Sequence, residues 1–192
     1  MSQTATGAAA APTVHGPPRV GLAGMWTFLA TDAMGFGGLF IAYGVLRVRA
    51  EAWPDPRAHL GLGLALAMTF GLLASAFTMT QATRAITARA RLGWLAATTG
   101  LGLAFLGGEL AEYRRLWTAG DPVRIGSGLY GGTFFALTGY HALHVAAGVL
   151  CLLAVAARGA RPRTLEVVAL YWHFVDLAWM PIFTFLYLMP AR

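Results

Sequence analysis

Long uncharged apolar stretches alternate with short polar segments along the whole chain. Two of these stretches contain one acid each, Asp32 and Asp176, and another runs on into Glu109 and Glu112. A helix needs about 20 predominantly apolar residues to cross a bilayer. We therefore predict an all-α fold, an integral membrane five-helix transmembrane bundle, with spans at about 22–46, 60–83, 92–117, 129–156 and 168–190.

The segments outside the predicted spans are short, and none could form a separate soluble domain. Residues 1–19 are rich in Ala, Thr, Gly and Pro and have no basic start, so we expect a flexible N-terminal tail and not a signal peptide. The apolar stretch that follows is also too long for a signal core, so we treat it as a retained first span. The transmembrane bundle is then expected to occupy residues 20–192.

Composition supports a membrane protein. Apolar residues make up 57% of the chain and charged residues 11%, against about 25% charged in an average soluble domain. The net charge of +6 comes from arginine alone, spread over the short loops. This distribution favours lipid headgroups over nucleic acid as the neighbour. Seven arginines are expected on each membrane face, and the acids lean only weakly toward a cytoplasmic N-terminus.

Ionisable residues inside spans are costly, so they usually have a partner or a function. Besides Asp32, they form three pairs spaced i, i+3, which places each pair on one helix face: Glu109 and Glu112, His141 and His144, and His173 and Asp176. At about 1.5 Å per residue these groups spread over roughly 20 Å of depth. One metal site cannot use them all, although a smaller subset could. Hydrogen bonds between helices and a proton relay are the other interpretations.

The single cysteine limits the chemistry of the chain. Cys151 lies inside the fourth predicted span and has no cysteine partner in the chain. The cysteine pairs of a dinuclear copper site or an iron–sulfur cluster are therefore missing.

Four motifs stand out along the chain. Residues 138–145 read TGYHALHV, and residues 171–176 read YWHFVD. They resemble the TGFHGLHV and YWHFVD segments of the haem-copper oxidase subunit III family, the cytochrome c oxidase subunit 3-like proteins. Residues 28–36 and 109–113 match its F(L/I)xSExMxF and Q/ExxEY segments. The motifs occur in the family's order, and the likeness runs from about Gly24 to Leu188.

The chain also departs from the family pattern. Five spans correspond to the short bacterial form that lacks the first two helices of the seven-span members. Asp32 stands where the family usually has glutamate, and Tyr140 and Ala142 replace Phe and Gly. Aspartate also occurs at this position in relatives associated with nitric-oxide reductases, so an accessory protein of such a reductase is the alternative within the family.

The resemblance implies a non-catalytic subunit of a respiratory terminal oxidase. It implies subunit I as the main contact, subunit II as a further partner, haem and copper in those partners and none in this chain, and bound phospholipid. It also implies support of proton uptake and complex stability, and a bacterial inner membrane location with a cytoplasmic N-terminus. Asp32 is the proton-handling candidate, because it is the only charge in its span and lies near the midplane.

Two functions of other classes stay open from the residues alone. A stand-alone membrane metalloenzyme would use part of the set Glu109, Glu112, His141 and His144. A proton-coupled transporter would be expected to show broken helices or internal repeats, and no convincing repeat is visible.

Overall fold

A computed structural model describes residues 20–56, 60–118 and 128–189 of the chain. The predicted flexible tail, residues 1–19, lies outside the described residues. Within them, five helices are long and apolar enough to cross a membrane. The predicted five-helix all-α bundle is thereby confirmed.

Most helices extend beyond the apolar segments from which they were predicted, although the second begins two residues after its predicted start at residue 60. They are α1 (Val20–Arg49), α3 (Leu62–Arg84), α4 (Ala88–Thr118), α5 (Leu129–Ala157) and α6 (Pro162–Phe183), followed by a π-helical turn, η1 (Thr184–Leu188). The largest difference is at the start of α6, which precedes the predicted start at residue 168. Pro162 occupies the first turn there, where its missing N–H costs nothing, so the helix begins before its apolar part.

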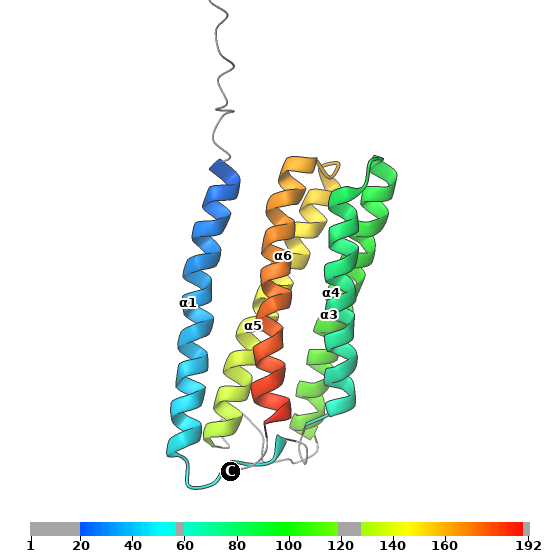
Figure 1. Cartoon of the computed structure of the whole chain (residues 1–192). Helices are drawn as coiled ribbons and strands as arrows, with labels where there is room; N and C mark the ends of the chain where they lie inside the picture. Colours follow the sequence, from blue (N-terminus) through cyan, green and yellow to red (C-terminus); the bar gives the residue numbers. More distant parts are fainter. Residues whose placement is uncertain (1–19, 57–59, 119–127, 190–192) are drawn as a thin grey trace, which may run out of the picture.

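The helices cross the bundle in alternating directions. Figure 1 shows the start of α1, the α3–α4 turn and the α5–α6 turn together at one end. The end of α1, the start of α5 and η1 lie at the other end. The α3–α4 turn consists of residues 85–87 alone, and Gly159, at a φ of 83°, allows the sharp turn after α5.

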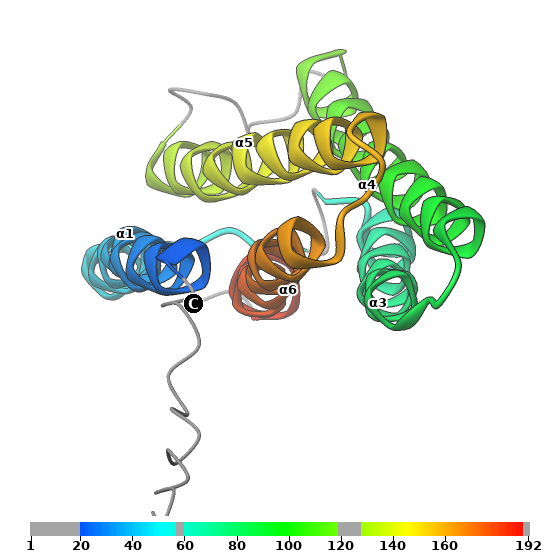
Figure 2. The ribbon, with the colours of Figure 1, turned by 90° about the horizontal axis from the view of Figure 1, so that it is seen from above.

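Helix α6 lies at the centre of the bundle and α1 at its edge. Viewed along the helices, α6 lies between α1 and α3, with α5 crossing behind it (Figure 2). In the most apolar 18-residue stretch of each helix, 56% of the residues are buried in α6, against 22% in α1. Helix α1 contacts α5 and α6 through a narrow stripe that includes Leu29, Asp32, Phe36 and Tyr43.

Trp172 of α6 fits between two glycines on neighbouring helices. A Cβ atom at Gly102 of α4 would lie 2.6 Å from the Trp172 ring, and one at Gly148 of α5 would lie 2.8 Å from it. Both helices can approach α6 this closely only because these residues have no side chain. The indole is fully buried, and its Nε1 donates to Ser75 Oγ of α3 at 3.0 Å.

The end of α6 is held by two tyrosines from other helices. Pro181 has no N–H to donate to the preceding turn, and the helix widens into η1 soon after it. Tyr43 of α1 donates to the Phe185 carbonyl at 2.7 Å, and Tyr130 of α5 donates to the Leu186 carbonyl at 2.9 Å. These bonds satisfy carbonyls that the helix end leaves without an intrahelical donor.

Candidate functional site

Asp32 joins α1 to α5 through two side chains of the fourth span. Its Oδ1 accepts a hydrogen bond from the Tyr140 hydroxyl at 2.9 Å and lies 3.1 Å from His144 Nε2. Asp32 is 8% exposed, and its second oxygen, Oδ2, is buried without a hydrogen-bond partner. Tyr140 and His144 are one helical turn apart, so both can reach the same carboxyl group.

The hydrogen bonds of the His144 ring determine how many protons Asp32 and His144 hold between them. Nδ1 lies 2.7 Å from the Tyr140 carbonyl oxygen, which can only accept, so Nδ1 carries a proton. A hydrogen bond between Nε2 and Asp32 then needs one more proton, either on Nε2 or on the carboxyl group. The first case is an imidazolium–carboxylate ion pair, and the second is a neutral pair. Asp32 and His144 therefore share one proton that either group can hold.

Glu109 and Glu112 share a helix face but make different contacts. Glu112 Oε1 accepts the backbone N–H of Gly61 at 2.8 Å and a hydrogen bond from Arg115 at 2.8 Å. Gly61 is the residue at the start of α3 and has no side chain to cap that helix. Glu112 thus caps α3 from α4, where the positive end of the helix favours a carboxylate.

Glu109 is 3% exposed, and neither carboxyl oxygen has a hydrogen bond of good geometry. Its polar neighbours are Tyr113 and Thr138, whose hydroxyl groups bond each other at 2.6 Å. An acid buried next to hydroxyl groups, without a cation, is held most easily in its neutral form.

His141 lies in an aromatic cage and not with His144. Its side chain is fully buried, and neither ring nitrogen has a hydrogen-bond partner. The ring centroids of Phe105 and Trp179 lie 5.4 and 5.2 Å from that of His141. His144 instead faces α1, so the i, i+3 spacing on α5 does not bring the two histidines to a common partner.

His173 and Asp176 also have different surroundings. Asp176 is buried against α3, with its two oxygens 3.4 and 3.5 Å from Ser75 Oγ. His173 lines an apolar groove of about 390 Å³ between α1 and α6, together with Trp26 and Phe174. Among the described residues no hydrogen bond to His173 is formed. The structure therefore gives a partner on a neighbouring helix to Asp176 alone.

The predicted residues form several small clusters and not one centre. Within residues 20–56, 60–118 and 128–189, no group of three or more His, Cys, Asp and Glu side chains could hold a metal ion. The clusters instead join α1 to α5, α3 to α4 and α3 to α6.

Sequence analysis missed the residues that complete these clusters. Ser75 and Gly61 of the second span contact Asp176 and Glu112 and carry no distinguishing motif. Tyr140 was noted only as a departure from the family pattern. Its place between Asp32 and His144 could have been anticipated, because it lies one turn before His144 on the same helix face.

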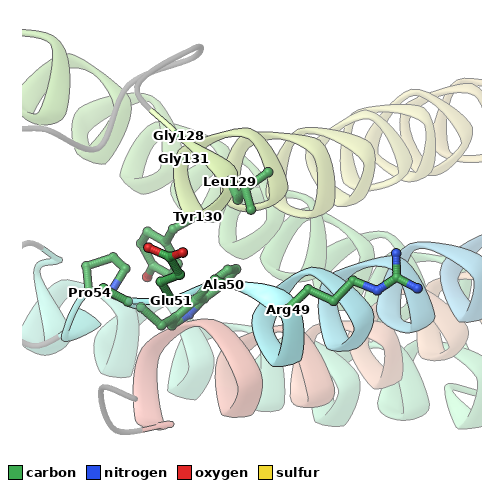
Figure 3. A pocket seen from close by; sticks show the side chains of 10 residues that line it. Arg49, Ala50, Glu51, Pro54, Gly128, Leu129, Tyr130 and Gly131 are labelled. Carbon is green, nitrogen blue, oxygen red and sulfur yellow. The ribbon is translucent and has the colours of Figure 1, made fainter.

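A pocket of about 460 Å³ lies at the end of the bundle where α1 ends and α5 begins. Figure 3 shows Glu51 near Tyr130 in this pocket, with Arg49 extended away from them along α1. Residues 128–131 form the opposite wall. The pocket lies at the end of α1, more than four helical turns from Asp32, and contains none of the predicted site residues.

Comparison with known proteins identifies one family. A family model described as cytochrome c oxidase subunit III matches residues 18–190. Cytochrome c oxidase subunit 3 of Thermostichus vulcanus is 33% identical over 186 residues, covering 91% of this chain and 90% of the relative. The probable cytochrome c oxidase subunit 3 of Mycobacterium tuberculosis strain H37Rv is 34% identical over 195 residues, covering 95% of each chain.

A relative with a different electron donor in its name is equally similar. Cytochrome bo(3) ubiquinol oxidase subunit 3 of Pseudomonas aeruginosa is 34% identical over 180 residues. The match covers 88% of this chain and 84% of the relative.

Proposed function

The chain belongs to the cytochrome c oxidase subunit III family, and we propose that it is the non-catalytic subunit III of a respiratory haem-copper terminal oxidase. In this role it packs on subunit I, binds phospholipid and supports proton uptake and complex stability during electron transport to oxygen. Haem and copper belong to the partner subunits, and this chain carries neither. It lies in the bacterial inner membrane with its N-terminus in the cytoplasm.

The observation that supports this proposal most is how the charged side chains of the family motifs are used. Asp32 is bonded to His144 and Tyr140, Asp176 lies against Ser75, and Glu112 caps α3. Each contact joins two helices. Acids and histidines used in this way stabilise a bundle, as expected of a subunit that supports its neighbours and holds no redox centre.

Asp32 is also the residue that supports a role of this chain in proton uptake. It shares one proton with His144, and its Oδ2 is free to accept a hydrogen bond. The pair is neutral overall while it holds this proton, and release of the proton leaves a carboxylate that still accepts a hydrogen bond from Tyr140. We propose that Asp32 takes up and releases this proton during turnover.

A strain that lacks this chain tests the non-catalytic role. The remaining complex is expected to keep its haem and copper content and to start turnover normally, and then to lose activity during sustained turnover. Oxygen consumption and haem spectra of the purified complex measure both. Loss of a stoichiometric haem or copper together with the chain would show that the chain holds the redox centre itself.

A further inference from the structure

The apolar groove of about 390 Å³ between α1 and α6 runs along both helices, which Figure 2 shows side by side. Its lining extends from Trp26 to Ala33 on α1 and from Leu170 to Leu177 on α6. Each wall therefore follows its helix for two turns, about 10 Å. A groove of this length between two helices can accept the apolar face of a third helix.

His173 is the one ionisable side chain among the residues that line this groove. Its side chain is partly exposed and forms no hydrogen bond with any residue in the described ranges. His173 lies about 16 Å from one end of its 27-residue span and about 22 Å from the other, so it lies inside the hydrocarbon layer. Acyl chains cannot form hydrogen bonds. The imidazole therefore needs a polar partner that reaches it through the groove.

A second groove, on the other side of α1, lacks this requirement. It lies between α1 and α5 and has a volume of about 320 Å³. The one polar side chain among its lining residues, Thr133, already donates to the Leu129 carbonyl of its own helix at 2.9 Å. Acyl chains alone can fill this groove without leaving a polar group unpaired. In the α1–α6 groove the same filling would leave the His173 ring without a partner.

The α1 wall of the α1–α6 groove also allows a close approach. Ala30 and Ala33 are exposed one turn apart on this helix. Small residues let helix backbones come close together in lipid, where packing and interhelical hydrogen bonds hold helices together. Trp26 and Leu177, which are 59% and 68% exposed, provide larger apolar surfaces beside the alanines. The groove thus combines a close backbone approach, apolar contact and one hydrogen-bonding group.

We propose that the α1–α6 groove binds one transmembrane helix of a partner subunit, and that this helix carries a hydroxyl, amide or carboxyl side chain at the level of His173. The hydrogen bond across the groove satisfies the imidazole, and apolar side chains of the helix pack on Ala30 and Ala33. The inference rests on the proposed function in one respect, that the chain is a subunit of a membrane complex. It adds the surface that the partner contacts and the chemical group that the partner brings.

Photochemical cross-linking in native membranes identifies the occupant. Benzoylphenylalanine introduced at Leu177 lies in the α1–α6 groove, and benzoylphenylalanine introduced at Ala136 lies in the α1–α5 groove as the control. The complex is purified after irradiation, and its cross-linked peptides are sequenced by mass spectrometry. Position 177 is expected to label a transmembrane segment of another subunit, with a polar residue within one turn of the cross-link. Position 136 is expected to label lipid.

Exchange of the bound chain against labelled wild-type chain, in the purified complex, measures the contact itself. H173F keeps a ring and removes the hydrogen bond, so exchange is expected to become about 3–10-fold faster. H173Q keeps a donor and an acceptor and should restore most of the wild-type rate. A33L fills the α1–α6 groove and should also accelerate exchange, whereas A136L fills the α1–α5 groove and should not. Thermal melting in detergent checks that each variant is folded, and A33L against A136L decides if H173F is not.

Three results overturn the proposal. They are labelling of lipid alone or of a second copy of this chain from position 177, labelling of the same peptide from position 136, and a wild-type exchange rate in folded H173F or A33L. Each leaves the proposed function standing when a haem-bearing subunit co-purifies with the chain. A labelled helix in a complex without haem would instead support the groove and contradict the proposed function.

Discussion

Asp32 is the single residue on which the proposed proton role depends. Tyr140 and His144 contact the same Asp32 oxygen, so the amide of Asp32→Asn can keep one of the two bonds, and the complex is still expected to assemble with normal haem content. The amide cannot exchange the shared proton. Turnover is therefore expected to fall below wild type, with a deficit that grows as pH rises and protons become scarce. Oxygen consumption across a pH series measures this.

Tyr140→Phe is the matched control for Asp32→Asn. It removes one hydrogen bond to the same carboxyl group and leaves the acid and His144 in place. Its pH–activity profile should have the wild-type shape. A wild-type profile in Asp32→Asn would eliminate the proton role and leave Asp32 as part of the scaffold.

Glu112 tests whether a buried acid of the motifs is structural. Glu112→Ala removes the acceptor for the Gly61 N–H and the partner of Arg115, so it is expected to destabilise the chain by about 1–3 kcal/mol. Glu112→Gln keeps an acceptor and should cost less. Glu166→Ala changes an exposed glutamate and is expected to stay within about 0.5 kcal/mol of wild type. Thermal melting in detergent compares the three, and equal melting of Glu112→Ala and Glu166→Ala would contradict the capping role.

At the scale of the helix, the close approach of α5 to α6 depends on Gly148. A methyl group there would lie 2.8 Å from the fully buried Trp172 ring, so Gly148→Ala is expected to cost about 1–3 kcal/mol through overpacking. Gly107→Ala is the control, because nothing lies within 4 Å of its added Cβ and alanine favours a helix by up to about 1 kcal/mol. The two variants should therefore shift the melting temperature in opposite directions. A neutral Gly148→Ala would show that the helices separate without cost.

The number of helices could be predicted from sequence, and their order in the bundle could not. Apolar length alone identifies a span, because lipid demands about 20 apolar residues whatever the neighbours are. Helix α6 carries His173 and Asp176 and is nevertheless the most buried helix. Its central place depends on how Trp172 fits against Gly102 and Gly148, which are far from it in the chain.

Spacing on a helix predicted a shared face but not a shared partner. His141 and His144 are one turn apart, and yet His141 packs between Phe105 and Trp179 while His144 reaches α1. Two side chains one turn apart on a helix point in somewhat different directions. Where several helices pack together, they can therefore contact different helices. Which helices converge is decided by packing between distant segments and cannot be derived from spacing.

At the scale of the whole molecule, the chain is expected to have its N-terminus in the cytoplasm. The arginines are expected to divide equally between the two membrane faces, so this orientation rests mainly on the family resemblance, with a weak lean of the acids in the same direction. A green fluorescent protein fused to the N-terminus should fluoresce, and an alkaline phosphatase fused there should be inactive. The reverse result would contradict this orientation.

Purification of the tagged chain from its native membranes in mild detergent tests the central claim most directly. The account predicts that a haem- and copper-bearing oxidase subunit I co-purifies in equal amount, and that the complex consumes oxygen. Chain stripped from that complex should show no Soret band and no stoichiometric metal. A complex that reduces nitric oxide and not oxygen would reassign the chain to the accessory proteins of nitric-oxide reductases. Isolation of the chain with no haem-bearing partner, or with a metal of its own, would contradict the account altogether.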